Sequence, residues 1–152
     1  MLRARRAKQE DARFLFELRN EKAVREASLT TAPVLWDAHQ MWFANCITSP
    51  MRFLYVLEEE GLSVGQVRFD VTSSTDQAEV SISISERFRG RGYGRQALLC
   101  AHGEFFAECP AIKQIHAQVK HGNQASLKMF EFAGYKLADA SDPSVSRLLF
   151  DR

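Results

Sequence analysis

The chain has 152 residues, a formal net charge of +1, and 45% hydrophobic and 26% charged residues. This is the composition of an ordinary globular protein, and it excludes the low hydrophobicity and high net charge of a disordered chain. The balanced charge also argues against a nucleic-acid or membrane partner, and a binding site for an anion would have to come from a local cluster of basic residues. From its length we expect one compact domain over residues 1–152.

The cysteines and the N-terminal segment indicate the compartment. Cys46, Cys100 and Cys109 are odd in number and lack C-x-x-C spacing, which is typical of reduced thiols rather than of disulfides or a metal site. The basic start, Met-Leu-Arg-Ala-Arg-Arg, is followed by no apolar segment, and no stretch approaches the roughly 20 apolar residues of a membrane span. We therefore expect a cytoplasmic protein with no metal.

The first half of the chain alternates between helical and strand patterns. Residues 11–20 and 37–46 carry apolar side chains at three- and four-residue spacing, which predicts two helices. Residues 53–58 and 62–70 are predicted strands of a hairpin with Gly61 in its turn. Residues 78–85 alternate strictly between apolar and polar, which predicts a strand with one buried face.

The second half continues this alternation. A glycine-rich turn precedes a predicted helix that stops near Cys109-Pro110, and residues 115–119 form the next predicted strand. Asn123 is placed to cap a helix that runs to Phe132, and Gly134 to close it. The last apolar run, residues 148–150, is predicted to add an edge strand. This order, without repeats or linkers, predicts one mixed α/β domain.

The strongest chemical signal is the turn Arg89-Gly-Arg-Gly-Tyr-Gly94, which lies between a predicted strand and a helix N-terminus. Glycines permit positive φ and remove Cβ atoms, so successive N–H groups can converge on phosphate oxygens, and Arg89, Arg91 and Arg95 add positive charge. A plain turn with solvated arginines is the alternative. A Rossmann motif is disfavoured by the G-x-G-x-G spacing, and no Gly-Lys-Ser/Thr of a P-loop is present.

These residues resemble the motifs of a known family. Arg89-x-x-Gly92-x-Gly94 is similar to the pyrophosphate-binding motif of the GNAT acetyltransferases, and residues 78–84 resemble their fourth strand. Asn123-x-x-Ser126-x-x-x-Phe130-x-x-x-Gly134-Tyr135 resembles their C-terminal helix motif. The resemblance implies a single-domain α+β GNAT fold with a mixed sheet of about six to seven strands and about four helices. It also implies acetyl-CoA as donor, no metal, and direct transfer to a primary amine.

In that family the pantetheine of the coenzyme lies along the fourth strand. Ile82, Ser83 and Ile84 are the matching positions, and the resemblance implies that their free N–H groups polarise the thioester carbonyl. Many members carry at the position of Phe130 a tyrosine that protonates the thiolate, so this chain departs from the pattern, and Tyr135 is expected to be a core residue. The resemblance implies a coenzyme site formed by Ile82, Ser83, Ile84, Arg89, Gly90, Arg91, Gly92, Tyr93, Gly94, Arg95, Asn123, Ser126 and Phe130.

Two residues are candidates for the catalytic base. Glu79 is on the polar face of the strand that leads to the site, although it could instead be structural or orient the substrate while water carries the proton. His39 is the second candidate because an unperturbed imidazole titrates near neutral pH, although a histidine beside an apolar stripe is more often structural. His102, His116 and His121 have no ligand cluster around them.

The acceptor depends on the N-terminal half. Its L-R-N, V-R-x-x-S, H-x-x-W-F and G-Q-V-R-F-D segments resemble nucleotide-sugar N-acetyltransferases of pseudaminic acid biosynthesis, which acetylate the 4-amino group of a UDP-linked amino sugar. Arginines suit a diphosphate and Trp42 a stacking face, although each residue alone could be solvated or core. The resemblance implies an acceptor site formed by Arg19, Asn20, Arg25, Ser28, His39, Trp42, Arg68 and Asp70.

Other functions stay open at this point. A ribosomal-protein N-terminal or lysine acetyltransferase shares the fold, and the phenylalanine at position 130 admits an inert acyl-CoA-binding domain. A nucleic-acid binder using Arg3, Arg5 and Arg6 is disfavoured by the balanced charge. A homodimer is possible in this family, and the sequence of the tail carries no specific signature of one.

Overall fold

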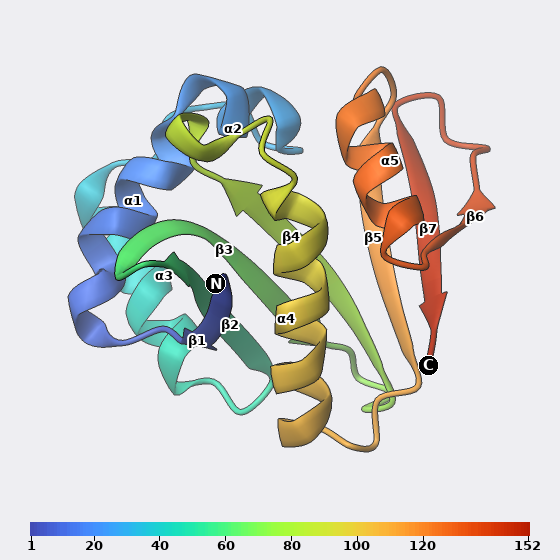
Figure 1. The fold of residues 1–152 in the computed structure, drawn as a ribbon, viewed down its shortest axis with the longest axis horizontal. Helices are drawn as coiled ribbons and strands as arrows, with labels where there is room; N and C mark the ends of the chain where they lie inside the picture. The colour runs from blue at the N-terminus through green and yellow to red at the C-terminus, as the bar shows by residue number, and fades with distance from the viewer.

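The computed structural model describes all 152 residues and is built around a seven-stranded sheet with the order β1-β2-β3-β4-β5-β7-β6 (Figure 1). The strands are β1 (Arg3–Arg6), β2 (Arg52–Glu59), β3 (Leu62–Val71), β4 (Gln77–Ile84), β5 (Gln114–Lys120), β6 (Lys136–Asp139) and β7 (Val145–Asp151). The α-helices are α1 (Ala12–Asn20), α2 (Lys22–Ala27), α3 (Trp36–Thr48), α4 (Tyr93–Glu108) and α5 (Gln124–Phe132). No helix is long and apolar enough to cross a membrane.

Helices cover the sheet on both faces and create two cores. The larger core joins α4 to side chains such as Tyr55 and Leu57 of β2, and the smaller one joins α1 and α3 to Leu54 and Val56 of the same strand. Because successive strand residues point to opposite faces, β2 is buried on both of them. This explains why residues 54–57 are all apolar, whereas β4 alternates.

Most predicted elements are confirmed, including the two early helices, the hairpin and the strand–turn–helix segment. Gly61 has a φ of 79° in the hairpin turn, as expected of a residue that must enter the left-handed region. The capping role of Asn123 is also confirmed, because its Oδ1 accepts the N–H of Ser126 at 3.2 Å. The helix α2 and the strand β1 were not predicted.

The prediction that residues 148–150 form an edge strand is wrong. β7 lies inside the sheet, with β5 on one side and β6 on the other. Val145 and Leu148 of β7 are buried, whereas all four residues of β6 are exposed. The edge is therefore formed by the short, solvated β6.

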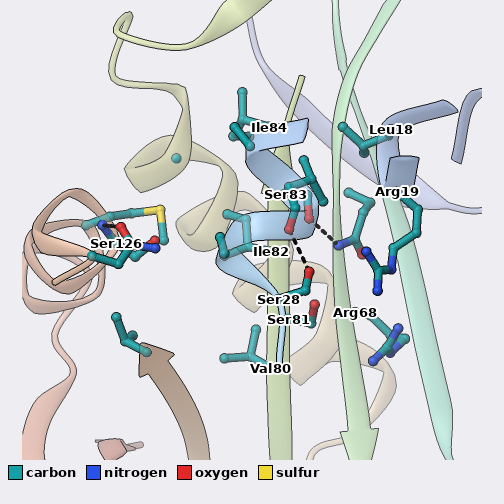
Figure 2. A pocket seen from close by; sticks show the side chains of 18 of the residues that line it. Leu18, Arg19, Ser28, Arg68, Val80, Ser81, Ile82, Ser83, Ile84 and Ser126 are labelled. Atoms are coloured by element: carbon teal, nitrogen blue, oxygen red, sulfur yellow. Dashed lines mark hydrogen bonds between the residues drawn. The ribbon is translucent and has the colours of Figure 1, made fainter. Parts of the chain in front are cut away.

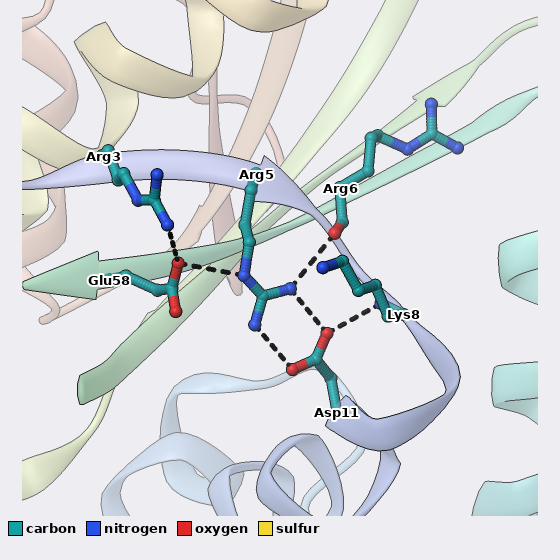
Figure 3. Close-up of polar contacts among 6 residues, drawn as sticks. All are labelled: Arg3, Arg5, Arg6, Lys8, Asp11 and Glu58. Carbon is teal, nitrogen blue, oxygen red and sulfur yellow. Dashed lines mark hydrogen bonds and ion pairs between the residues drawn. The ribbon is translucent and has the colours of Figure 1, made fainter. Parts of the chain in front are cut away.

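The basic N-terminus is held by acidic side chains (Figure 3). Arg5 forms two bonds of 2.8 Å with the carboxylate of Asp11, and Arg3 and Arg5 both contact Glu58 at 3.0 Å. Burial of Asp11 opposes its ionisation, but the bonds from Arg5 and from the N–H of Lys8 outweigh it and lower the pKa of Asp11. These arginines fix β1 against β2 and α1.

Candidate active site

The site is organised by a gap between β4 and β5. The two strands pair in parallel only where Gln77–Val80 face Gln114–Ala117, whereas β4 continues to pair with β3 as far as Ile84. Beyond Val80 the β5-facing edge of β4 is therefore unpaired. Figure 2 shows this stretch, with Ile82 and the serines pointing to opposite sides of the strand.

The β3–β4 register decides which N–H groups face the gap. The N–H of Ser85 donates to the carbonyl of Val64 at 2.8 Å, one residue beyond the last pair of the register, Gly65 and Ile84. Because hydrogen-bonding direction alternates along a strand, Ser83 also turns its backbone groups toward β3, and Ile82 and Ile84 turn theirs toward the gap. The expectation of a free N–H is thus wrong for Ser83 and is supported for Ile82 and Ile84.

The glycine-rich turn enters α4 in the geometry of an anion site. Gly90 and Gly92 both have a φ of 76°, and Gly92 is the N-cap of α4, which no side chain caps. The N–H groups of the first turn are consequently available for an anion. Arg89 donates from Nε to the carbonyl of Ile84 at 2.9 Å, which ties the turn to the end of β4.

A cavity of about 1670 Å³ connects this turn with the gap and with the N-terminal helices. Among the predicted coenzyme residues, Arg91 is absent from its lining, and its guanidinium lies 5.7 Å from the ring centroid of Phe88. The other predicted coenzyme residues all line the cavity: Ile82, Ser83, Ile84, Arg89, Gly90, Gly92, Tyr93, Gly94, Arg95, Asn123, Ser126 and Phe130.

Phe130 brings no hydroxyl to this cavity. Its ring is buried against Tyr135, at 5.0 Å between centroids. The hydroxyl of Tyr135 lies 2.8 Å from Nε2 of His102, and burial raises the pKa of Tyr135 well above its usual value. Tyr135 is therefore a core residue, as the sequence indicated, and cannot replace the missing proton donor.

The α1–α3 side of the cavity is polar. Arg68 of β3 donates from Nε to both carboxylate oxygens of Asp70 at 3.2 and 3.1 Å, and its guanidinium lies 5.3 Å from the ring centroid of Trp42. Arg19 of α1 donates from Nη2 to the carbonyl of Thr30 at 2.9 Å. Figure 2 shows Arg19 and Arg68 on the side of β4 that carries Ser81 and Ser83.

A family model described as an acetyltransferase (GNAT) domain matches residues 2–136. The chain belongs to the GNAT acetyltransferases. It is similar in fold to a spermidine N-acetyltransferase from Vibrio cholerae, solved with CoA and spermine, at 18% identity, covering 99% of this chain and 95% of that one with a TM-score of 0.89. The aminoglycoside acetyltransferase AAC(6')-Ib, solved with coenzyme A, is 15% identical, covers 100% and 95%, and gives a TM-score of 0.83. No curated protein matches the chain in sequence.

Membership in the GNAT family makes the chain an acyltransferase and confirms the expected fold class, with seven strands in the sheet. The α/β arrangement places the glycine-rich turn, the gap and α5 around one cavity. No group of three or more His, Cys, Asp or Glu side chains in the structure could hold a metal ion.

Two predicted acceptor residues of this GNAT domain do not line the cavity. Asn20 donates to the carbonyl of Val34 at 2.9 Å and accepts its N–H at 2.7 Å, and Arg25 donates to the carbonyls of Asn20 and Thr31. Both side chains hold the segment between α2 and α3. Their assignment to the acceptor site is therefore corrected to a role in shaping its wall, whereas the remaining predicted residues line the cavity: Arg19, Ser28, His39, Trp42, Arg68 and Asp70.

The environment of His39 favours the structural alternative. Its side chain is buried, and its Nε2 donates to the carbonyl of Ala12 at 3.1 Å, which joins α3 to α1. Its ring also packs between Trp36 and Phe43. Burial lowers the pKa of His39 despite the bond to Ala12.

Glu79 remains on the solvated polar face of β4. It is exposed, lines the cavity, and accepts a 2.8 Å bond from Nε2 of Gln118 of β5. Glu79 is paired with His116 in the last part of the β4–β5 ladder, so its carboxylate lies just before the gap opens. Its position suits a base that is reached through water.

No sequence pattern indicated Glu21, which joins the two halves of the GNAT site. Its carboxylate accepts the hydroxyl of Ser85 at 2.9 Å and the N–H of Glu86 at 2.8 Å, and lies 3.8 Å from Arg89. Glu21 thereby fixes the junction of α1 and α2 against the start of the glycine-rich turn. Only tertiary structure reveals this contact, because 65 residues separate Glu21 from Glu86.

Proposed function

We propose that the chain transfers an acetyl group from acetyl-CoA to a primary amine, and that the acceptor is the 4-amino group of a UDP-linked amino sugar. The observation that carries this proposal is the unpaired edge of β4 beyond Val80, which opens into a cavity shared by the glycine-rich turn and the polar N-terminal side. Donor and acceptor can therefore meet at the same strand.

The chemistry follows from that edge. The pantetheine pairs with β4, the N–H groups of Ile82 and Ile84 polarise the thioester carbonyl, and the pyrophosphate binds at Gly90–Gly92. The neutral amine attacks the carbonyl carbon, the C–S bond breaks, and the amine proton leaves through water toward Glu79. The leaving thiolate takes a proton from solvent. A thiol has a pKa of about 8.5, so its thiolate is a tolerable leaving group without a tyrosine.

The acceptor side supports a nucleotide sugar in size and chemistry. Ligand pockets usually occupy about 300–1,000 Å³, whereas this cavity has about 1670 Å³, which leaves room for an acceptor beside the coenzyme. Arg68 supplies a cation, and Trp42 an aromatic face suited to a uracil. Ser28, whose hydroxyl donates to the carbonyl of Val24 at 2.6 Å, adds an acceptor for sugar hydroxyls.

Glu79→Gln is expected to lower kcat several-fold at pH values at which the carboxylate is ionised, because the amide can still bond Gln118 but cannot take a proton. The KM for coenzyme should stay unchanged, because the glycine-rich turn is untouched. The measurement is the pH profile of kcat for the variant and for the wild type. Profiles that coincide would assign the proton to water alone.

A thiol-release assay tests the proposed function. Acetyl-CoA is offered with a UDP-4-amino sugar and, separately, with spermidine, an aminoglycoside and a lysine-containing peptide. We expect release with the sugar at a rate well above the others. Release only with the peptide would favour the protein acetyltransferase, and coenzyme binding without release for any acceptor would favour the inert domain.

A further inference from the structure

The only two buried side-chain N or O atoms without a hydrogen-bond partner are Nη1 of Arg19 and Oε1 of Gln66. Both residues line the cavity described above. An unpaired buried polar atom destabilises a fold by about 1–3 kcal/mol, so such atoms usually gain a further partner, which is water, an ion or a ligand. Two residues of the cavity wall thus carry one unpaired donor and one unpaired acceptor.

Arg19 lacks a compensating anion. Its bond from Nη2 goes to the carbonyl of Thr30, and none of its contacts is a carboxylate. Burial, together with the positive charges of Arg25 and Arg68, lowers the pKa of Arg19. A partly buried guanidinium beside two other cations is stabilised most by an anionic group that forms a charge-assisted bond with it.

Gln66, the second residue of this subsite, contacts β4 directly. It faces Ser83 in the β3–β4 register, and its Nε2 donates to the hydroxyl of Ser83 at 3.3 Å. The open Oε1 therefore lies beside the strand at which acetyl transfer is proposed. A carbonyl oxygen in this position accepts an N–H or O–H of a bound molecule.

We infer that Arg19 and Gln66 bind the acceptor directly, Arg19 through a phosphate or carboxylate group and Gln66 through an N–H or O–H next to it. The inference rests on the proposed acetyl transfer. It restricts the acceptors by their charge: they carry an anionic group near the amine, and polyamines are excluded. A polycation would bring further positive charge to Arg19 and leave its Nη1 unpaired.

The test compares acceptors that differ only in the anion. Glucosamine 6-phosphate is paired with glucosamine, galactosamine 6-phosphate with galactosamine, and a UDP-4-amino sugar and spermidine are added. In the wild type we expect the anionic member of at least one pair to have a kcat/KM about tenfold higher, which corresponds to about 1.4 kcal/mol. Arg19→Gln should reduce this ratio to near one, mainly through KM.

Arg13→Gln is the matched control, because Arg13 lies on the same helix, carries the same charge and is exposed outside the cavity. It should keep the full preference, and both variants should bind coenzyme A as the wild type does. A ratio near one in the wild type, or a ratio that survives Arg19→Gln, overturns the inference. Loss of the UDP-sugar reaction alone, with an Arg19-dependent preference for another anionic amine, overturns only the proposed acceptor.

Binding provides a readout that needs no turnover. Malonate and inorganic pyrophosphate are titrated into protein saturated with coenzyme A, so that the glycine-rich turn is already occupied. We expect at least one of them to bind the wild type and Arg13→Gln, and to bind Arg19→Gln about tenfold more weakly. No detectable binding of either anion to the wild type at millimolar concentration rejects the subsite.

Gln66→Met separates binding from structure. Methionine has a similar shape and removes both the unpaired Oε1 and the 3.3 Å bond to Ser83, so the variant should unfold at a temperature close to that of the wild type while kcat/KM for the preferred acceptor falls about tenfold. A loss of stability with unchanged kinetics would assign Gln66 a structural role only.

Discussion

Gly92→Leu is expected to weaken the binding of coenzyme A by at least about tenfold. Gly92 caps α4 with a φ of 76°, a conformation that leucine adopts only with strain. Leucine would therefore shift the turn, and its side chain would block the approach of the pyrophosphate to the N–H groups of the first turn of α4. Calorimetric titration of coenzyme A into the variant measures the loss.

Gly61→Leu is the control for strain. Gly61 has a φ of 79° and, like Gly92, has no neighbour within 4 Å of an added Cβ, but it lies in the β2–β3 hairpin turn, outside the cavity lining. The two variants should lose similar stability, of about 1–2 kcal/mol, and only Gly92→Leu should lose coenzyme affinity. Equal affinities in both variants would contradict the assignment of the turn to the pyrophosphate.

The elements that the sequence predicted are those whose signals are local. The alternation of residues 78–84, the glycines of the turn and the cap at Asn123 each act within one element, so neighbouring residues reveal them. β1 was not predicted, because three of its four residues are arginines and it therefore lacks the apolar pattern of a strand. Its strand character comes from pairing with β2 and from the acidic partners Asp11 and Glu58.

The free N–H groups of β4 could not be predicted from the local pattern of the sequence. A period of two indicates which residues share a face, but the direction of the backbone bonds depends on the register with the neighbouring strand. The bond from Ser85 to Val64 sets that register, and it turns Ser83 toward β3. Expecting a free N–H at all three positions ignored this alternation.

The acceptor residues show a second limit. Asn20 and Arg25 are polar residues on or beside α1 and α2, and a sequence pattern cannot distinguish a side chain that faces a ligand from one that bonds a backbone carbonyl. Both bond the segment between α2 and α3. Arg19, next in sequence to Asn20, lines the cavity, because neighbouring residues of a helix point in different directions.

Gly65→Ala is expected to lower the free energy of unfolding by about 1–3 kcal/mol and to reduce kcat even at saturating acetyl-CoA. Gly65 is buried in β3 opposite Ile84, where a Cβ would collide with the backbone carbonyl of Ser83 and lie 3.1 Å from the Cα of Ile84. Backbone atoms cannot rotate away, so β3 and β4 must separate. Thermal unfolding should record a decrease of about 2–4 °C for each kcal/mol lost.

Gly103→Ala is the matched substitution, because Gly103 lies inside α4 with no neighbour within 4 Å of an added Cβ. It should stabilise the protein by up to about 1 kcal/mol, because alanine is the better helix former. An unchanged melting temperature and unchanged kcat for Gly65→Ala would show that the strands have room to adjust. The loss of kcat that we expect for Gly65→Ala has a structural cause. The added Cβ collides with backbone atoms of Ser83 and Ile84, so the substitution that separates β3 from β4 also displaces the edge that is proposed to hold the thioester carbonyl.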